Sequence, residues 1–121
     1  MEIQIKRAYE APSKSDGFRV LVDRLWPRGI SKEDLSIKMW AKSIAPSSEL
    51  RKWFNHDPSR WSEFSKRYRH ELKSADARHA MEDVLQAAQG SSSITLVYGA
   101  KDTEHNQAVV LQSVLHSLSK R

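Results

Sequence analysis

Two clusters of polar residues, each placed shortly after an apolar run, carry side chains that could do chemistry. The run at 18–22 is followed by Asp23, Arg24, Trp26 and Arg28. The run at 94–98 is followed by Lys101, Asp102, His105 and Asn106. Guanidinium and ammonium groups bind phosphates and carboxylates, so both clusters suit an anionic ligand.

These side chains divide into ligand-binding and catalytic candidates. The predicted ligand-binding residues are Arg24, Trp26, Arg28, Lys101 and Asn106. Among them, Arg28 can hold a phosphate or carboxylate through two parallel hydrogen bonds. The candidates for acid–base catalysis are Asp23, Asp102 and His105, because carboxylates and imidazoles are common proton carriers in enzymes.

Each candidate also has a purely structural interpretation. Asp23 can be ion-paired with a neighbouring arginine, Arg19 or Arg24. Asp102 can cap a helix, and Asn106 can satisfy backbone groups. The histidine of the second cluster can be a plain surface residue, and the tryptophan of the first can be a packing residue. The sequence alone leaves these alternatives open.

The strands expected at 18–22 and 94–98 would position both clusters. Both runs are short and apolar, which is typical of buried strands in a parallel sheet. If the strands are parallel, their carboxyl ends lie at one edge of the sheet, where ligands of open α/β sheets bind. A helix that begins near Asp102 or Thr103 would direct free backbone N–H groups at this edge, which favours an anion.

The rest of the chain predicts a small α/β domain. Alternating residues indicate two further strands, at 3–5 and 37–41. Caps and helical spacing predict a short turn from Ser31, helices from Ser47 or Ser48 and from Pro58, and a helix that ends at Gly90. We expect residues 1–121 to form a single domain, a mixed or mostly parallel sheet of about four strands with about four to five helices, in a two-layer or three-layer sandwich.

Composition excludes several functional classes. The chain is 39% hydrophobic and 29% charged and has no cysteine, so it offers no disulfide, thiolate metal site or cysteine nucleophile. No metal-ligand spacing, nucleotide-binding loop or serine-hydrolase motif occurs, so we expect neither a metal nor a cofactor. The N-terminus lacks a signal-peptide pattern, and no apolar run is long enough to span a membrane. We therefore expect a cytoplasmic protein without a membrane partner.

A basic segment suggests a second function. Residues 51–79 hold eight Lys and Arg against four Asp and Glu, within a chain of net charge +5. The candidate nucleic-acid contacts in this segment are Arg60, Lys66, Arg67, Arg69 and Lys73. Such cations neutralise phosphates, although a solvated helix face is the plainer interpretation.

Four segments and a helical pattern carry a family resemblance. The segments are VLVDRLWPRG at 20–29, WAKSIAPS at 40–47, LRKWFNHDP at 50–58 and KDTEHN at 101–106. The helical pattern consists of Trp61, Phe64, Arg67, Tyr68 and the pair at 71–72. Together they resemble the YeaO-like branch of the domain of unknown function 488 family over nearly the whole chain. The resemblance implies a small bacterial or archaeal cytoplasmic α/β protein and implies no reaction.

One difference from the wider family limits the chemistry. Many members outside this branch carry a cysteine followed by His-Arg about where residues 106–108 stand here. Asn106 can donate and accept hydrogen bonds but cannot attack as a thiolate, so a thiol mechanism cannot transfer to this chain. Either this branch binds without covalent chemistry, or its chemistry uses Asp23, Asp102 or His105.

Three hypotheses follow. The first is that the protein binds an anionic, phosphate-bearing small molecule at the edge formed by residues 23–29 and 101–106. The alternative is a nucleic-acid-binding accessory protein that uses the basic region 51–79. The third is a role in stability or assembly without a ligand, in which Trp40 or Trp53 forms a dimer contact. The sequence determines neither the oligomeric state nor whether the protein is an enzyme.

Overall fold

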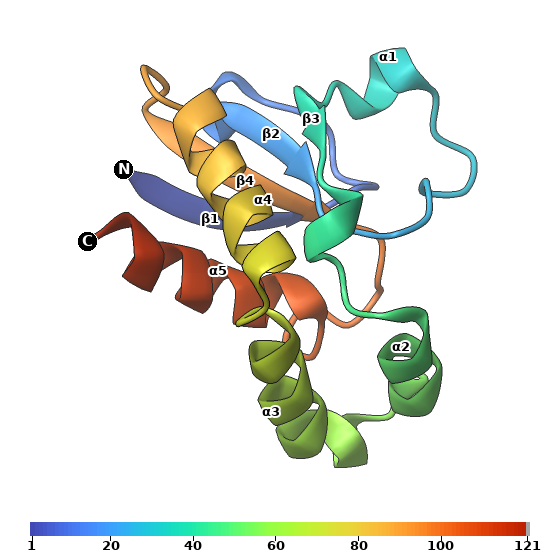
Figure 1. The fold of residues 1–121 in the computed structure, drawn as a ribbon. Coiled ribbons are helices and arrows are strands. Elements are labelled where there is room, and N and C mark those ends of the chain that lie inside the picture. The colour runs from blue at the N-terminus through green and yellow to red at the C-terminus, as the bar shows by residue number, and fades with distance from the viewer. Residues whose placement is uncertain (121) are drawn as a thin grey trace.

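A sheet of four parallel strands organises the molecule (Figure 1). The structure is a computed structural model, and it describes residues 1–120. Across the sheet the order of strands is β1 (Glu2–Arg7), β4 (Ser93–Tyr98), β2 (Phe18–Leu21) and β3 (Met39–Trp40). This architecture confirms the expected α/β class. The two apolar runs that precede the polar clusters are β2 and β4, and they are neighbours.

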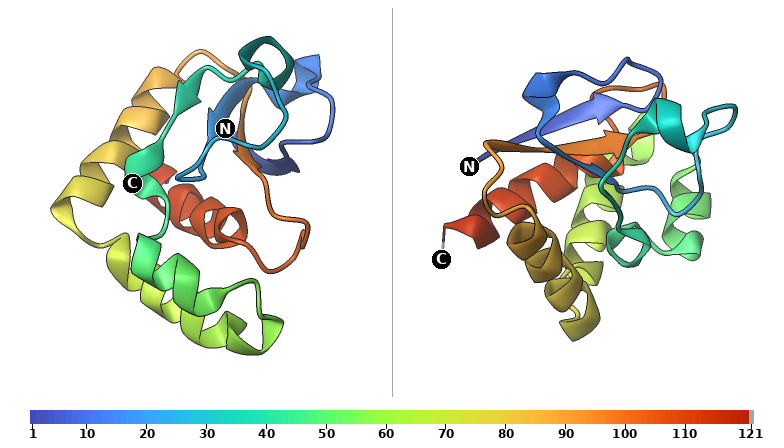
Figure 2. Two further views of the ribbon diagram at one scale, coloured as in Figure 1. Left: turned by 90° about the vertical axis from the view of Figure 1, so that its right-hand side faces the viewer. Right: turned by 90° about the horizontal axis from the view of Figure 1, so that it is seen from above.

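Three helices lie on one side of the sheet (Figure 2). They are α3 (Trp61–Glu71), α4 (Ala75–Ala87) and α5 (Gln107–Ser119). The main core forms between these helices and the sheet, and its fully buried side chains include Val20, Leu96, Tyr68, Val84 and Leu111. No helix within residues 1–120 is long and apolar enough to cross a membrane.

Two short helices complete the fold. α1 (Lys32–Leu35) belongs to the opposite face of the sheet, where Leu35 packs with Leu21 and Val97 in a smaller core. α2 (Ser48–Phe54) packs against α3 and lies below the end of the sheet in Figure 1. The fold is therefore a two-layer sandwich with a partial third layer. α2 lies beyond the carboxyl ends of the strands.

Polar caps start the elements where the sequence predicts them. The Oγ of Ser31 accepts a hydrogen bond from the N–H of Asp34 at 3.1 Å. The Oγ of Ser47 accepts one from the N–H of Leu50 at 3.1 Å. Asp57 caps a 3-10 turn over Pro58–Arg60, which leads directly into α3. These caps satisfy N–H groups that helix ends leave without partners.

Two predicted boundaries are wrong. The strand expected at 37–41 is only Met39–Trp40, because only these two residues are in register with β2. The last helix begins at Gln107, after Asn106 as its cap, and not near Asp102 or Thr103. Asp102 instead accepts hydrogen bonds from two backbone N–H groups of an irregular turn, at positions 104 and 105.

A buried ion pair supports the face of the sheet opposite the three helices. Arg19 and Asp16 are 4% and 3% exposed, and Arg19 Nη1 lies 2.7 Å from Asp16 Oδ2. Lys6 Nζ adds a second contact at 3.1 Å. Arg19 also donates two hydrogen bonds to the carbonyl of Leu35. Burial alone raises the pKa of Asp16, but the N–H of Ser13 and the neighbouring cations lower it to about 2.

Replacing Asp16 with Asn is expected to lower the free energy of unfolding by about 3 kcal/mol or more, because Arg19 loses its buried counter-charge. The lowered pKa of Asp16 gives stability that is present above the unfolded pKa of 3.8 and is lost as pH falls towards about 2. Urea unfolding measured from neutral to acid pH should therefore show a flatter profile for the variant. Asp34→Asn, at an exposed position, is the control. Equal stability of D16N and the parent protein would contradict this account.

Candidate functional site

A cavity beyond the carboxyl ends of β2 and β4 brings most of the predicted site residues together. The two strands run parallel, with Leu21 paired to Val97 at the end of their register. The cavity has a volume of about 660 Å³, and we call it the strand-end cavity. The predicted residues that line it are Asp23, Arg24, Trp26, Lys101, Asp102, His105 and Asn106. Arg28 is exposed and does not line it.

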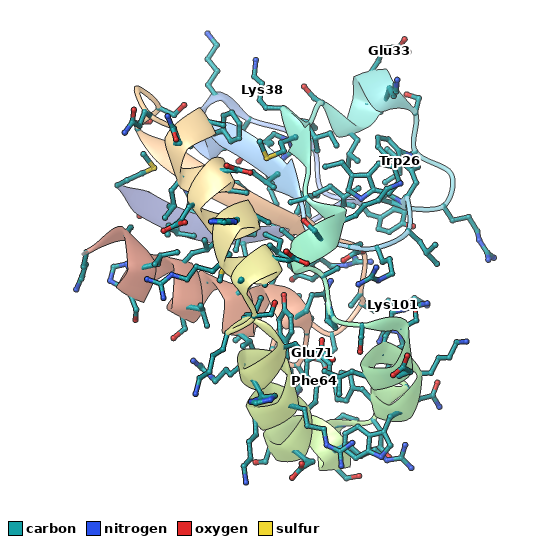
Figure 3. All side chains as sticks on the ribbon, in the orientation of Figure 1. Trp26, Glu33, Lys38, Phe64, Glu71 and Lys101 are labelled. Atoms are coloured by element: carbon teal, nitrogen blue, oxygen red, sulfur yellow. The ribbon has the colours of Figure 1, made fainter. Side chains whose placement is uncertain are left out.

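Loops and helices on several sides form the wall. Figure 3 shows three lining residues, with Trp26 on the loop after β2, Lys101 on the loop after β4 and Phe64 on α3. Residues 45–46, which precede α2, line it as well. The cavity therefore lies at the edge of the sheet where the sequence predicts it, with α2 and α3 as its far wall.

The carboxylate of Asp23 joins the two loops. Its Oδ2 accepts a hydrogen bond from the N–H of Gly99 at 2.8 Å, and its Oδ1 accepts one from the side-chain amide of Gln107. A Cβ atom at position 99 would stand 3.0 Å from Oδ2, so glycine leaves the carboxylate the room it needs. Asp23 thus ties the end of β2 to the end of β4 and to the first turn of α5.

Burial makes the carboxyl of Asp23 harder to ionise than that of an exposed aspartate. Burial raises the pKa of Asp23 above its ordinary value of 3.8. The hydrogen bonds from Gly99 and Gln107 and the charges of Arg51 and His56 lower it, but they do not cancel the effect of burial. A carboxyl with a raised pKa in a cavity is a typical candidate for a general acid or base, or for a group that exchanges a proton with a ligand.

The guanidinium of Arg24 is held by main-chain carbonyls and not by an acid. It donates hydrogen bonds to the carbonyls of residues 45–46 at 3.4 and 3.2 Å. No carboxylate within residues 1–120 forms an ion pair with it, and Arg19 pairs with Asp16 on the opposite face. The pairing considered for Asp23 with Arg24 or Arg19 is therefore wrong. Arg24 is partly buried and keeps its charge and its remaining N–H groups available.

Asp102 and His105 form a hydrogen-bonded pair at the cavity. His105 Nδ1 lies 2.9 Å from Asp102 Oδ2, which leaves Nε2 as the free ring nitrogen. The His105 ring also meets the Trp61 ring edge to face, with centroids 5.4 Å apart. The pKa of Asp102 is lowered, first by the N–H of Glu104 and then by His105. Asp102 is therefore held as a carboxylate that orients the imidazole.

Asn106 has a structural task. It is 1% exposed, and its Oδ1 accepts hydrogen bonds from the N–H groups of Ala108 and Val109 at 2.9 and 3.3 Å. Its Nδ2 donates to the carbonyl of Asp102 at 2.9 Å. Its amide is therefore occupied within the protein. The helix start expected near Thr103 lies instead at Gln107, and Asn106 already engages two N–H groups of its first turn.

Several lining residues are absent from the sequence-based prediction. They are Arg51, Phe54 and His56 near α2, Phe64 on α3, and Gln107 at the start of α5. His56 follows α2 with a φ of 54°, in the left-handed region that only a minority of non-glycine residues adopt. The segment LRKWFNHDP contains three of these residues, but its apolar spacing predicts only a helix and a turn. No group of three or more His, Asp or Glu residues within 1–120 could hold a metal.

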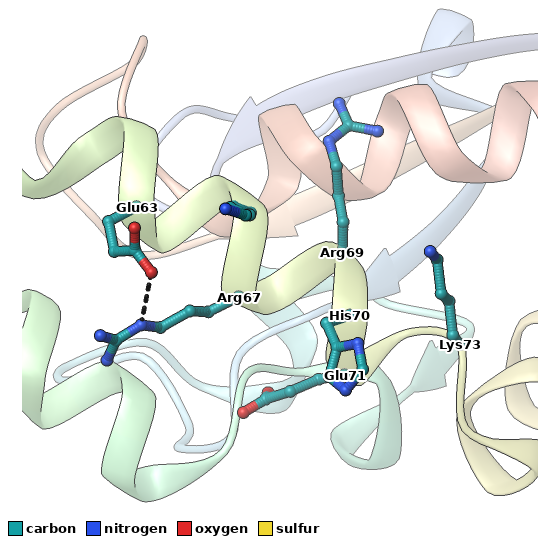
Figure 4. Close-up of a pocket in the computed structure, with 7 residues that line it drawn as sticks. Glu63, Arg67, Arg69, His70, Glu71 and Lys73 are labelled. Carbon is teal, nitrogen blue, oxygen red and sulfur yellow. Dashed lines mark hydrogen bonds and ion pairs between the residues drawn. The ribbon is translucent and has the colours of Figure 1, made fainter.

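The basic residues of α3 line a second hollow, which we call the α3 groove (Figure 4). Its volume is about 610 Å³. The lining consists of Glu63, Lys66, Arg67, Arg69, His70, Glu71 and Lys73. Arg67 donates a hydrogen bond to Glu63 at 2.9 Å, and Glu71 accepts hydrogen bonds from the N–H and hydroxyl of Ser47. Both acids of the groove therefore have partners.

The predicted nucleic-acid contacts fall into two groups. Arg60 pairs with Asp57 and donates to the carbonyl of Trp53. Arg67 lies over the Trp53 ring, 4.4 Å from its centroid, while it pairs with Glu63. The remaining three have no ion-pair partner within residues 1–120, and they are Lys66, Arg69 and Lys73. Only this second group has its charge available along the α3 groove.

Comparisons with known proteins identify the same family over nearly the whole chain. Residues 2–121 match the family model described as "Inactive DUF488-N3 subclade". The uncharacterized protein YeaO of Escherichia coli K12 is 45% identical over 119 residues, which are 98% of this chain and 100% of that protein. Uncharacterized proteins of Mycobacterium bovis and Mycobacterium tuberculosis H37Rv are 40% identical over 114 residues, 94% of this chain and 93% of each relative. No solved structure matches the chain. These matches confirm the family resemblance.

Asp23→Asn is expected to unfold at an equal or higher temperature than the parent protein at neutral pH. The raised pKa of Asp23 gives stability that is present below 3.8 and is lost as pH rises through the folded-state value. Asparagine removes this loss and keeps an acceptor for the N–H of Gly99. Melting temperatures measured from acid to neutral pH test the expectation.

Asp102→Asn provides the matched comparison, because the pKa of Asp102 is shifted in the opposite direction. This variant should lose stability at neutral pH and match the parent protein in acid. The interpretation of Asp23 fails if D23N melts well below the parent protein at neutral pH while D102N does not.

Proposed function

The chain belongs to the inactive DUF488-N3 subclade, and from that premise we propose that it binds an anionic, phosphate-bearing small molecule in the strand-end cavity without turning it over. The description of the subclade as inactive argues against catalysis. The absence of cysteine from the chain is consistent with this, because the thiol considered for other members is missing.

The placement of Arg24 carries this proposal. Two backbone carbonyls hold its guanidinium in the wall of the cavity, and no carboxylate within residues 1–120 neutralises it. A partly buried and immobilised guanidinium loses little side-chain entropy when it contacts an anion. Arg51 and Lys101 line the same cavity and add positive charge. Phosphate, with several acceptor oxygens, is the anion that such a set of donors suits best.

The other polar groups of the cavity would orient the ligand. The Asp102–His105 pair leaves one imidazole nitrogen free, and Asp23 can accept or donate a hydrogen bond according to its protonation state. These residues remain the candidates if the protein does catalyse a reaction.

Nucleic-acid binding is a second candidate, which the α3 groove favours. Lys66, Arg69 and Lys73 follow one another at helical spacing along α3 and its end, and both acids of the groove have partners. Three cations in a row resemble the contacts that proteins make with a phosphate backbone.

Arg24→Ala is expected to weaken binding of a phosphate monoester such as ribose 5-phosphate about tenfold or more, because hydrogen bonds to charged groups are lost. Arg28→Ala is the control, since Arg28 lies outside the cavity. Thermal shifts against inorganic anions and sugar phosphates at low salt identify binding, and calorimetry measures it. The proposal fails if no phosphate-bearing molecule binds the parent protein, or if both variants bind as it does.

The triple variant Lys66→Gln, Arg69→Gln, Lys73→Gln tests the second candidate. Each phosphate contact contributes roughly 0.9 to the slope of log affinity against log salt on duplex DNA, so the slope should fall by about 2.7. The control is Arg60→Gln, Arg67→Gln, whose guanidinium groups are already engaged. An unchanged slope in the triple variant, measured by fluorescence anisotropy, excludes this surface.

A further inference from the structure

The strand-end cavity is larger and more apolar than an inorganic anion requires. Its volume of about 660 Å³ lies in the range of cavities that hold drug-sized ligands. The apolar part of its lining includes Leu25, Trp26, Pro27, Phe54 and Phe64. Bound phosphate alone would leave this surface in contact with water. A ligand with an aromatic part would cover this apolar surface, and the burial of that surface would add to its affinity.

Trp26 lines the cavity and also packs against the smaller core on the opposite face of the sheet, and its indole N–H is not available to a ligand. The indole N–H already donates to the carbonyl of Ile30 at 2.6 Å. The ring meets that of Trp40 edge to face, with centroids 5.4 Å apart, which immobilises it. Trp26 is nevertheless partly exposed, and it lines the cavity. An immobilised tryptophan ring is a suitable surface for stacking of a planar ring.

The carboxylate of Asp23 adds a second requirement. Its two hydrogen bonds from Gly99 and Gln107 leave further acceptor positions on both oxygens. An ionised carboxylate repels a plain anion but accepts hydrogen bonds from hydroxyl groups. Arg51 lines the same cavity as Asp23 and carries a positive charge, so a cationic position and an acceptor position occur together there. A ligand that carries an anion and hydroxyl donors close together would match both positions.

We infer that the ligand of the strand-end cavity is a ribonucleoside monophosphate, with its phosphate at Arg24, its sugar hydroxyls at Asp23 and its base against Trp26. This inference rests on the proposed function, and it adds the class of ligand. Sugar phosphates supply the anion and hydroxyls but no ring. Aryl phosphates supply the anion and ring but no hydroxyls. Of these three classes of phosphate ester, the nucleotide alone meets all three requirements.

Isothermal titration calorimetry of the full chain can measure how much the phosphate, the hydroxyl groups and the ring each add to affinity. The probes are the 5′-monophosphates of adenosine, guanosine, cytidine and uridine, together with ribose 5-phosphate and phenyl phosphate. At least one nucleotide should bind about tenfold or more tightly than ribose 5-phosphate, because stacking of the base is added. The same nucleotide should bind more tightly than phenyl phosphate, which has no hydroxyl groups for Asp23.

Two variants test which residues give the nucleotide its higher affinity. Trp26→Leu should remove the advantage of the nucleotide over ribose 5-phosphate and leave the affinity for ribose 5-phosphate unchanged. Asp23→Asn should weaken nucleotide binding and leave phenyl phosphate binding unchanged or stronger. Trp53→Leu is the control, because Trp53 does not line the cavity. Circular dichroism checks folding, and if W26L does not fold, the comparison of ligands in the parent protein decides alone.

The outcomes separate this inference from the proposed function. If ribose 5-phosphate and the nucleotides bind equally and Arg24→Ala abolishes both, the proposed function stands and the nucleotide inference is wrong. If phenyl phosphate binds as tightly as the nucleotides, the role of Asp23 is wrong. If no phosphate-bearing probe binds, both are wrong.

Discussion

The carboxylate of Asp23 is the constraint around which the strand-end cavity is built. It stands at the end of β2 and accepts hydrogen bonds from Gly99, after β4, and from Gln107, in the first turn of α5. Burial raises the pKa of Asp23, because its charged form has a higher free energy in the cavity wall than in water. A buried carboxyl with a raised pKa at a cavity is a candidate functional group.

Arg19, on β2, and Arg24, on the loop after it, have different partners. Arg19 is buried with Asp16 and Lys6, and the carboxylate neutralises it within the protein. Arg24 is held by carbonyls of residues 45–46, and no carboxylate within residues 1–120 forms an ion pair with it. The first arrangement stabilises the fold. The second lies in the strand-end cavity, and in the function that we propose an anion supplies its counter-charge.

Local rules predict much of this fold, and they fail where distant segments meet. Apolar runs and single cap residues such as Ser47 define β2, β4 and the start of α2, because these depend on neighbours in the chain. The sequence does not identify the cap of α5, because Asp102, Thr103 and Asn106 all suit that role locally. The sequence does not indicate Arg51 and His56 as site residues, because their position in the same cavity as Asp23 depends on how α2 packs against α3.

The most direct test of the account is a titration of isotope-labelled protein with inorganic phosphate, followed by nuclear magnetic resonance. The account predicts saturable shifts at the side-chain N–H of Arg24, the N–H of Gly99 and the amide of Gln107, together with a change in the titration of Asp23. Shifts confined to the α3 groove, or no shifts at any phosphate concentration, would contradict the assignment of the strand-end cavity as the anion site.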